Sequence, residues 1–406
     1  MIGASASGGN ETGRDGRLDV IVIGAGQAGL AMAWHLAQGG LHFVVLEAAD
    51  ELGSSWRGRW DSLRLFSPAQ YDALPGMAFP APADTYPGKE AVAEFLRDYA
   101  TRFDLPVQLG KRVTALSRIG DEFQVRTGEE VFRARQVLVA TGPFQSPFRP
   151  EAGHGFDGSV TQIHSAHYRN PQSLPPGPVL VVGGGNSGLQ IAHELVATRQ
   201  VDVSVGEKVP MLPQRLLGRD LFWWLTRLGF MRVNTATRLG QRLRARGEFV
   251  IGTNRRRLKR AGVRFRPRLA NAQGRTARFA DHSSLDVSTV VWATGYRSDY
   301  SWISIPGVTA DGRVVHRRGI TDVPGLYFLG LSWQYTRGSA LLGFVADDAA
   351  YLAEQIAAQA QSTRQTQVEA ARQPPFAPPS NEPLQTAGQD RFDRPTRDAG
   401  STTVPE

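Results

Sequence analysis

A glycine-rich turn between an apolar run and a helical pattern occurs twice in this sequence, and the repeat constrains the fold more than any other feature. The first copy, VIVIGAGQAGLAMAWHL, begins at Val20, and the second, VLVVGGGNSGLQIAHEL, begins at Val179. In each copy the turn follows a short apolar run that is typical of a buried strand. Two such units predict an α/β chain with two Rossmann-like dinucleotide-binding domains.

Each glycine of the repeated turn has a separate physical role. The first permits the tight turn after the strand, the second lets the backbone approach a pyrophosphate, and the third allows close packing of helix on strand. The helix start then presents free N–H groups and a positive dipole end to the phosphates. The glycines, and the helix-opening residues that we expect to assist them, are Gly24, Gly26, Gln27, Ala28 and Gly29 in the first copy, and Gly183, Gly185, Asn186, Ser187 and Gly188 in the second.

The two copies differ at the end of the strand that follows each helix. Glu47 ends the run FVVLE, where a carboxylate accepts both hydroxyls of an adenosine ribose. The equivalent position in the second copy is Gly206, and the missing carboxylate leaves room for a 2′-phosphate. The sequence therefore favours NADPH over NADH at the second unit, with Lys208, Arg199 or Arg215 as the expected cation. FAD at the first unit is the simplest redox partner for a nicotinamide.

Two later β-rich runs each break at Ala-Thr-Gly and indicate how the units are nested. Thr141 and Gly142 end the first run, and Thr294 and Gly295 end the second. We expect the NADPH domain to be inserted in the FAD domain, and Ser339 to open a last helix that rejoins the FAD domain. The expected parts are a disordered N-terminus over 1–16, an FAD-binding domain over 17–150 and 291–360, an NAD(P)H-binding domain over 151–290 and a disordered tail over 361–406.

Composition excludes several other kinds of protein. The 406 residues include no cysteine, which excludes disulfides, thiolate nucleophiles and a CxxC redox pair, and no pattern supports a metal site. The sequence has neither a transmembrane run nor the apolar region of a secretory signal, so we expect a cytoplasmic protein. The net charge of +8 is concentrated between Arg215 and Arg268. No nucleic-acid module accompanies it, so a solvated basic surface is expected rather than nucleic-acid binding.

The stretch LGRDLFWWLTRLGF, residues 217–230, combines aromatic and apolar residues with a few charges. Three interpretations stay open: a buried amphipathic helix, the lining of a substrate tunnel, or contact with a membrane surface.

Beyond the glycine turns, four features resemble the flavin-dependent monooxygenases with two dinucleotide-binding domains, in their flavin-containing, Baeyer–Villiger and auxin-synthesis branches. LEAADELGSSW resembles the segment that wraps the flavin, and WDSLRLFSPAQYDALPGMAFP resembles the flavin-side loop. The two Ala-Thr-Gly motifs resemble the family's domain crossovers. FDGSVTQIHSAHYRNP resembles the fingerprint FxGxxxHxxx(Y/W), with two extra residues before His164.

The resemblance implies the cofactors FAD and NADPH, and a monooxygenase that forms a C4a-hydroperoxyflavin. One oxygen atom of O2 would pass to a nitrogen, a sulfur or a carbonyl compound. The resemblance further implies a homodimer whose partners are a small-molecule substrate and O2. It implies reaction-site roles for Phe66, Ser67 and His164. It implies cofactor contacts for Gly53, Ser55, Trp56, Val113, Thr141, Gly142, Thr294, Gly295, Gln334 and Ser339.

One departure keeps a second function open. Many relatives carry an asparagine in the flavin-side loop, thought to support the oxygenated flavin, where this chain has Phe66. An NAD(P)H:flavin oxidoreductase or oxidase without productive oxygen transfer is therefore the alternative. A nucleotide-binding protein without turnover is the third hypothesis.

Overall fold

The computed structural model describes residues 18–206, 209–247 and 249–372, with residues 367–372 described by their backbone alone. Its largest sheet has the strand order β3-β2-β1-β6-β5-β4, and β23 also pairs with β6. Strands β1, β2, β3, β6 and β23 pair in parallel, whereas β4, β5 and β6 form an antiparallel meander. The bounds are β1 Leu18–Ile23, β2 Phe43–Leu46, β3 Val107–Gln108, β4 Ala115–Ile119, β5 Glu122–Thr127, β6 Glu130–Val139 and β23 Leu326–Phe328.

Both faces of β1 are buried, as expected for the centre of a parallel sheet. Val20 and Val22 pack in a core shared with three helices, while Ile21 and Ile23 pack on the opposite face with β4 and β5. The strict alternation along β1 therefore sets which side chains meet the helices. Those helices are α1 Gln27–Gln38, α3 Lys89–Arg102 and α8 Ala346–Arg372.

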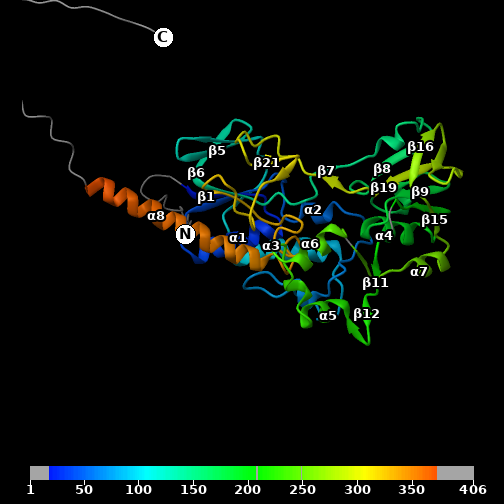
Figure 1. Ribbon diagram of the computed structural model, residues 1–406, viewed down its shortest axis with the longest axis horizontal. Coiled ribbons are helices and arrows are strands. Elements are labelled where there is room, and N and C mark those ends of the chain that lie inside the picture. Colours follow the sequence, from blue (N-terminus) through cyan, green and yellow to red (C-terminus); the bar gives the residue numbers. More distant parts are fainter. Residues whose placement is uncertain (1–17, 207–208, 248, 373–406) are drawn as a thin grey trace, which may run out of the picture. The chain divides into compact units, whose positions relative to one another are not determined.

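The second sheet is entirely parallel, with the order β15-β10-β9-β19-β8. Figure 1 shows its strands β8, β9 and β19 side by side. Helices α4 and α7 contribute to the core on one face, and the antiparallel β16–β17–β18 sheet contributes to the core on the other. The bounds are β8 Thr161–His164, β9 Val179–Val182, α4 Asn186–Leu195, β10 Val201–Ser204, α7 Arg255–Arg260, β15 Arg264–Arg266, β16 Leu269–Gln273, β17 Thr276–Phe279, β18 Ser284–Asp286 and β19 Thr289–Trp292.

The chain leaves the first sheet after β6, builds the second sheet, and returns to pair β23 with β6. The outgoing strand β7, Ser146–Pro147, pairs antiparallel with the returning strand β20, Tyr296–Arg297. The two connections between the sheets therefore run side by side. This topology confirms the predicted α/β class, with one Rossmann-like domain inserted in another; the exact residue boundaries stay predictions.

Smaller elements complete the chain. Between β10 and α7 lie β11 Met211–Leu212, β12 Arg215–Leu216, β13 Arg219–Asp220, α5 Leu221–Arg227, η4 Phe230–Arg232, α6 Arg238–Ala245 and β14 Val250–Ile251. Elsewhere lie α2 Ser54–Arg57, η1 Ala69–Tyr71, η2 Glu151–Gly153, η3 Pro171–Ser173, β21 Thr309–Ala310 and β22 Arg313–Val314.

Two expectations about the C-terminal part need correction. The last helix begins at Ala346 rather than at Ser339, because residues 337–345 form successive turns. Helix α8 then continues through Arg372, so the tail predicted as disordered from Gln361 is helical over its first residues. Residues 373–406 and the predicted disordered N-terminus lie outside the described residues. No helix among the described residues is long and apolar enough to cross a membrane.

Candidate functional site

The first glycine of each repeated turn is held in a backbone conformation that suits glycine alone. Gly24 has φ +104° and Gly183 has φ +125°, in the left-handed half of the map. A Cβ atom on Gly24 would lie 2.7 Å from the carbonyl oxygen of Ala140, and one on Gly183 would lie 2.1 Å from that of Ala293. These alanines open the two Ala-Thr-Gly motifs, so each motif packs against one glycine turn.

The other glycines of the turns separate into a packing position and an open position. A Cβ atom on Gly29 would lie 1.8 Å from the Gly24 carbonyl oxygen, and one on Gly188 would lie 2.2 Å from that of Gly183. At Gly26 and Gly185, by contrast, no atom lies within 4 Å of the Cβ position. This open space precedes the first N–H groups of each helix.

Neither helix start carries a side-chain cap. Gly26 is the N-cap of α1 and Gly185 is the N-cap of α4, and no side-chain hydrogen bond caps either helix. The first N–H groups of a helix need partners from outside it, and a phosphate group is a favourable one. Both turns therefore fit the pyrophosphate of a dinucleotide.

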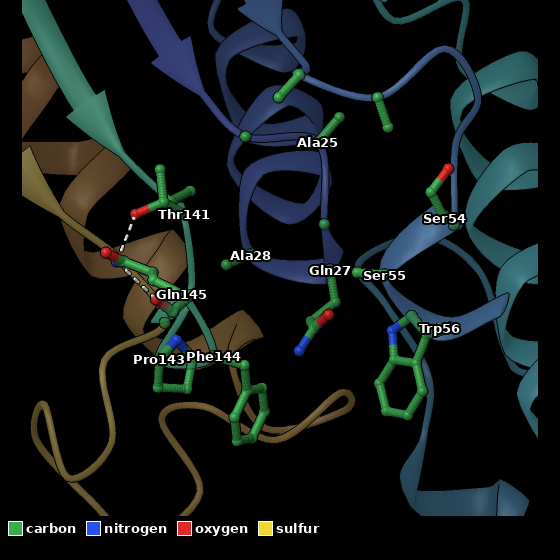
Figure 2. Close-up of a pocket in the computed structure, with 18 of the residues that line it drawn as sticks. Ala25, Gln27, Ala28, Ser54, Ser55, Trp56, Thr141, Pro143, Phe144 and Gln145 are labelled. Atoms are coloured by element: carbon green, nitrogen blue, oxygen red, sulfur yellow. Dashed lines mark hydrogen bonds between the residues drawn. The ribbon is translucent and has the colours of Figure 1, made fainter. Parts of the chain in front are cut away.

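A cavity of about 690 Å3 extends from the first glycine turn to the start of α4. In Figure 2, Gln27 of α1 lies between Trp56 of α2 and the loop that carries Thr141 and Phe144. Gln145 Nε2 donates to Thr141 Oγ1 at 3.0 Å and orders this loop. Many of the sequence-predicted residues line the cavity together: Gly24, Gly26, Gln27, Ala28, Glu47, Gly53, Ser55, Trp56, Phe66, Val113, Thr141, Gly142, Asn186 and Ser187.

Glu47 follows β2 and connects the glycine turn to the next loop. Its Oε2 accepts the backbone N–H of Ala25 at 2.7 Å, and its Oε1 accepts that of Ala49 at 3.0 Å. The carboxylate lines the cavity. It is thus fixed beside the position where a ribose would follow the pyrophosphate.

At the equivalent end of β10, the structure places a cation that sequence reasoning missed. A Cβ atom on Gly206 would lie 3.2 Å from Nε of Arg268. Among the described residues, no hydrogen bond or ion pair engages the Arg268 guanidinium. Arg264 and Arg266 both pair with the buried carboxylate of Asp202, which leaves Arg268 as the free cation of this alternating series.

The register between β10 and β15 explains this contact. Asp202 pairs with Arg264 and Ser204 with Arg266, so continuing the ladder by two residues brings Arg268 opposite Gly206. The buried Ser204 hydroxyl donates to Pro267 O and accepts from Leu269 N, both at 2.9 Å, and fixes the backbone on either side of Arg268.

Two of the three cations expected from the sequence, Arg199 and Arg215, lie elsewhere. The Arg199 guanidinium donates to the carbonyl oxygens of Pro171 and Leu174, and Arg199 precedes β10 whereas Gly206 follows it. Arg215 lies in the exposed β12–β13 hairpin. Lys208 lies outside the described residues.

His164 is buried and does not line the cavity. Its Nε2 lies 3.0 Å from the carbonyl oxygen of Gly295, and its Nδ1 accepts the N–H of Ala166 at 3.1 Å. Burial, the largest cause, lowers the pKa of His164, which favours the neutral ring that these two bonds require. Thr294 Oγ1 in turn donates to the Phe148 carbonyl oxygen. Thus His164 and Thr294 hold the crossover strands and do not face the cavity.

The flavin-side loop turns its two predicted reaction-site residues in different directions. Phe66 lines the cavity and stacks on Phe222, with ring centroids 6.1 Å apart. Ser67 is buried and donates to Asp72 Oδ1 at 2.6 Å. The second oxygen of Asp72 has no hydrogen-bond partner among the described residues, and burial raises the pKa of this carboxyl to about 7.

Gln334 and Ser339 are buried behind the cavity wall rather than in it. Ser339 Oγ accepts the N–H groups of Tyr335 and Thr336, at 3.1 and 3.0 Å. The cavity is lined instead by the next residue, Ala340. These two side chains therefore shape the turn that presents Ala340.

A second cavity, of about 540 Å3, adjoins the first. The two share Phe66 and Asn186 among their lining residues. Asn186 Oδ1 accepts the N–H of Ile251 at 3.1 Å, which fixes the start of α4 against β14. The second cavity gives a small molecule space between the flavin-side loop and α4. No group of three or more His, Asp or Glu side chains in the described ranges is arranged to hold a metal ion.

Comparison with known proteins agrees with this geometry. Residues 21–213 match the family model described as pyridine nucleotide-disulphide oxidoreductase, although this chain has no cysteine for disulfide exchange. An uncharacterized CzcO-like oxidoreductase of Geobacillus kaustophilus is 44% identical, over 84% of this chain and 98% of the relative.

Other similar proteins are named for a monooxygenase activity. The probable indole-3-pyruvate monooxygenase YUCCA9 of Arabidopsis thaliana is 30% identical, over 70% of this chain and 76% of the relative. The structure of a flavin-containing monooxygenase from Stenotrophomonas maltophilia superposes with a TM-score of 0.72 at 29% identity, covering 84% of this chain and 98% of that one. Together with the paired glycine turns, these similarities show that the chain belongs to the flavin-containing monooxygenase-like family of oxidoreductases.

Proposed function

We propose that this chain is an FAD-dependent monooxygenase that consumes NADPH and O2 and oxygenates a small organic molecule. NADPH supplies two electrons. One oxygen atom joins a nitrogen, a sulfur or a carbonyl compound, and the other leaves as water. The observation that carries the proposal is the 690 Å3 cavity, because the first glycine turn and the start of α4 both line it. A dinucleotide on each unit would then direct its reactive end toward one shared space.

The chain's own residues account for binding at the first unit. The free N–H groups at the start of α1 and the open space at Gly26 suit the FAD pyrophosphate. Glu47 is fixed by two backbone N–H groups and suits the ribose hydroxyls. When bound, the flavin supplies the hydride acceptance and oxygen activation that no side chain of this protein can perform.

The second unit suits NADPH. The uncapped start of α4 and the open space at Gly185 match the first unit. At Gly206, the absence of a side chain and the adjacent Arg268 guanidinium favour a 2′-phosphate over a bare ribose. Arg268 thus takes the role that the sequence suggested for Arg199 or Arg215, and the expectation for Lys208 stays a prediction.

One observation favours a second function, an NADPH oxidase that releases hydrogen peroxide. Phe66 offers the cavity an apolar ring, and the neighbouring Ser67 hydroxyl is bonded to Asp72. This part of the loop therefore offers no side-chain amide or free hydroxyl to a bound oxygen species. The apolar ring does help to exclude water, which also suits an oxygenase.

The test measures NADPH consumed and peroxide released by the flavin-loaded enzyme in air. The substrate panel contains a thioether, a tertiary amine and a cyclic ketone. A monooxygenase oxygenates at least one compound and releases much less peroxide than the NADPH it consumes. Equal amounts of peroxide and consumed NADPH with every compound, and no oxygenated product, would support the oxidase instead.

A further inference from the structure

We propose that the segment 215–232, here called the docking segment, binds the surface of a membrane that contains anionic lipid. It comprises the β12–β13 hairpin, helix α5 and the 3-10 turn η4. Its arginines would meet lipid headgroups while its exposed apolar side chains enter the membrane interface. The proposed redox function does not require this property.

The tip of the hairpin carries an exposed leucine in an unfavourable backbone conformation. Strands β12 and β13 leave two residues for the turn, Leu217 with φ +49° and Gly218 with φ +75°. Such turns favour Asn-Gly, because positive φ is costly for residues with larger side chains. The Leu217 residue is 82% exposed, so packing does not compensate for the strain. A strained and solvated leucine at a hairpin tip points to a contact outside the chain.

Other apolar side chains are exposed in the same short segment. Leu216 is 48% exposed, Leu228 62% and Phe230 46%. Trp224 Nε1 donates to the Leu216 carbonyl oxygen at 2.9 Å, which ties α5 to the hairpin. Figure 1 shows α5 and β12 as neighbours. Exposed leucines, phenylalanine and half-buried tryptophans are the side chains that peripheral proteins place at a membrane interface.

All the charged side chains that the docking segment exposes are positive. Its arginines, all exposed, are Arg215, Arg219, Arg227 and Arg232. Its one acid, Asp220, is buried and accepts from the Tyr86 hydroxyl at 2.6 Å and from the Phe222 N–H at 2.7 Å. The negative charge is thus directed inward, and the outer surface is complementary to anionic headgroups. Long arginine side chains can also cover apolar surface while their charge stays in water.

The experiment is co-sedimentation of the full-length, flavin-loaded protein with vesicles of phosphatidylcholine, alone or mixed with phosphatidylglycerol. We expect binding to the mixed vesicles only. Leu217→Asn should weaken that binding about ten-fold, the cost of losing one buried leucine side chain. Asparagine suits the left-handed turn, so the variant should melt no lower than the parent.

Ile119→Asn is the matched control, because Ile119 is 61% exposed in β4 of the other domain. It should leave vesicle binding unchanged. Equal binding to both vesicle types, binding that Leu217→Asn does not alter, or equal loss in the control would overturn the proposal. Self-association that Leu217→Asn abolishes, without vesicle binding, would overturn it too and assign the segment to a second copy of the chain.

Discussion

Glu47 and Gly206 occupy equivalent positions after β2 and β10, yet their surroundings have opposite charge. Glu47 places a carboxylate beside the first turn, whereas Gly206 leaves space beside the Arg268 guanidinium. The sequence predicted this contrast because both positions are fixed by local spacing. It did not predict Arg268, because that contact depends on the register between β10 and β15. The alternation of Arg264, Arg266 and Arg268 was the available signal.

Arg268→Ala should lower kcat/KM for NADPH by about 10- to 100-fold, the range expected for losing one charge-assisted hydrogen bond to phosphate. The value for NADH should change little, since NADH carries no 2′-phosphate. Steady-state kinetics with each nucleotide measure the ratio of kcat/KM for NADPH to kcat/KM for NADH. Arg278→Ala, which removes another exposed arginine in β17, is the control. An equal fall in kcat/KM for both nucleotides in Arg268→Ala would show that Arg268 does not bind the 2′-phosphate.

Asp72 should make the stability of the fold depend on pH. Its pKa is about 7 in the folded protein, against an ordinary value of 3.8, because the carboxyl is buried. Between these values the folded state holds a proton that the unfolded state releases. This contribution to the free energy of unfolding is therefore present below about pH 4 and is lost as the pH rises to about 7.

Asp72→Asn should remove that dependence, which amounts to a few kcal/mol at most. Urea unfolding of parent and variant at pH 5 and pH 8 measures it. The variant should gain stability relative to the parent at the higher pH. An identical difference between the two proteins at both pH values would show that Asp72 is ionised throughout.

At the scale of elements, local patterns predicted the strand–turn–helix units but not the start of the last helix. The glycine turns are defined by neighbouring residues, so both units lie where the sequence placed them. The segment before α8 is shaped by long-range packing instead. A Cβ atom on Gly343 would lie 1.9 Å from the Tyr71 carbonyl oxygen, a contact that no local pattern encodes. For the same reason, His164 could be recognised in a motif while its bond to Gly295 could not.

Matched substitutions of the third glycine in each turn can distinguish the functions of the two glycine-turn units. Gly29→Ala should abolish flavin retention, because the new methyl group would collide with the Gly24 carbonyl and displace α1. Gly188→Ala should leave flavin bound and raise KM for NADPH at least about ten-fold through the same collision in α4. Flavin absorbance after gel filtration and steady-state kinetics measure the two effects. Thermal melting checks that both variants fold. Loss of flavin from Gly188→Ala but not from Gly29→Ala would place FAD at the second unit instead of the first.

At the scale of the whole molecule, the nested order of the sheets explains why the first glycine turn and the start of α4, which are far apart in the sequence, line one cavity. Strand β23 returns to β6, and the crossover strands β7 and β20 pair between the sheets. The sequence predicted this nesting from the two Ala-Thr-Gly motifs. It did not predict wall residues such as Phe144, Trp302 and Val345, because they come from separate segments that only the tertiary fold brings together.

The central claim is that NADPH on the second unit reduces a flavin on the first. Anaerobic stopped-flow mixing of the flavin-loaded protein with NADPH tests it most directly, through the flavin absorbance near 450 nm. We predict complete bleaching by one equivalent of NADPH, with a rate of reduction that saturates as the NADPH concentration rises. NADH should reach the same rate only at a far higher concentration. A flavin that stays oxidised in the presence of NADPH would contradict it.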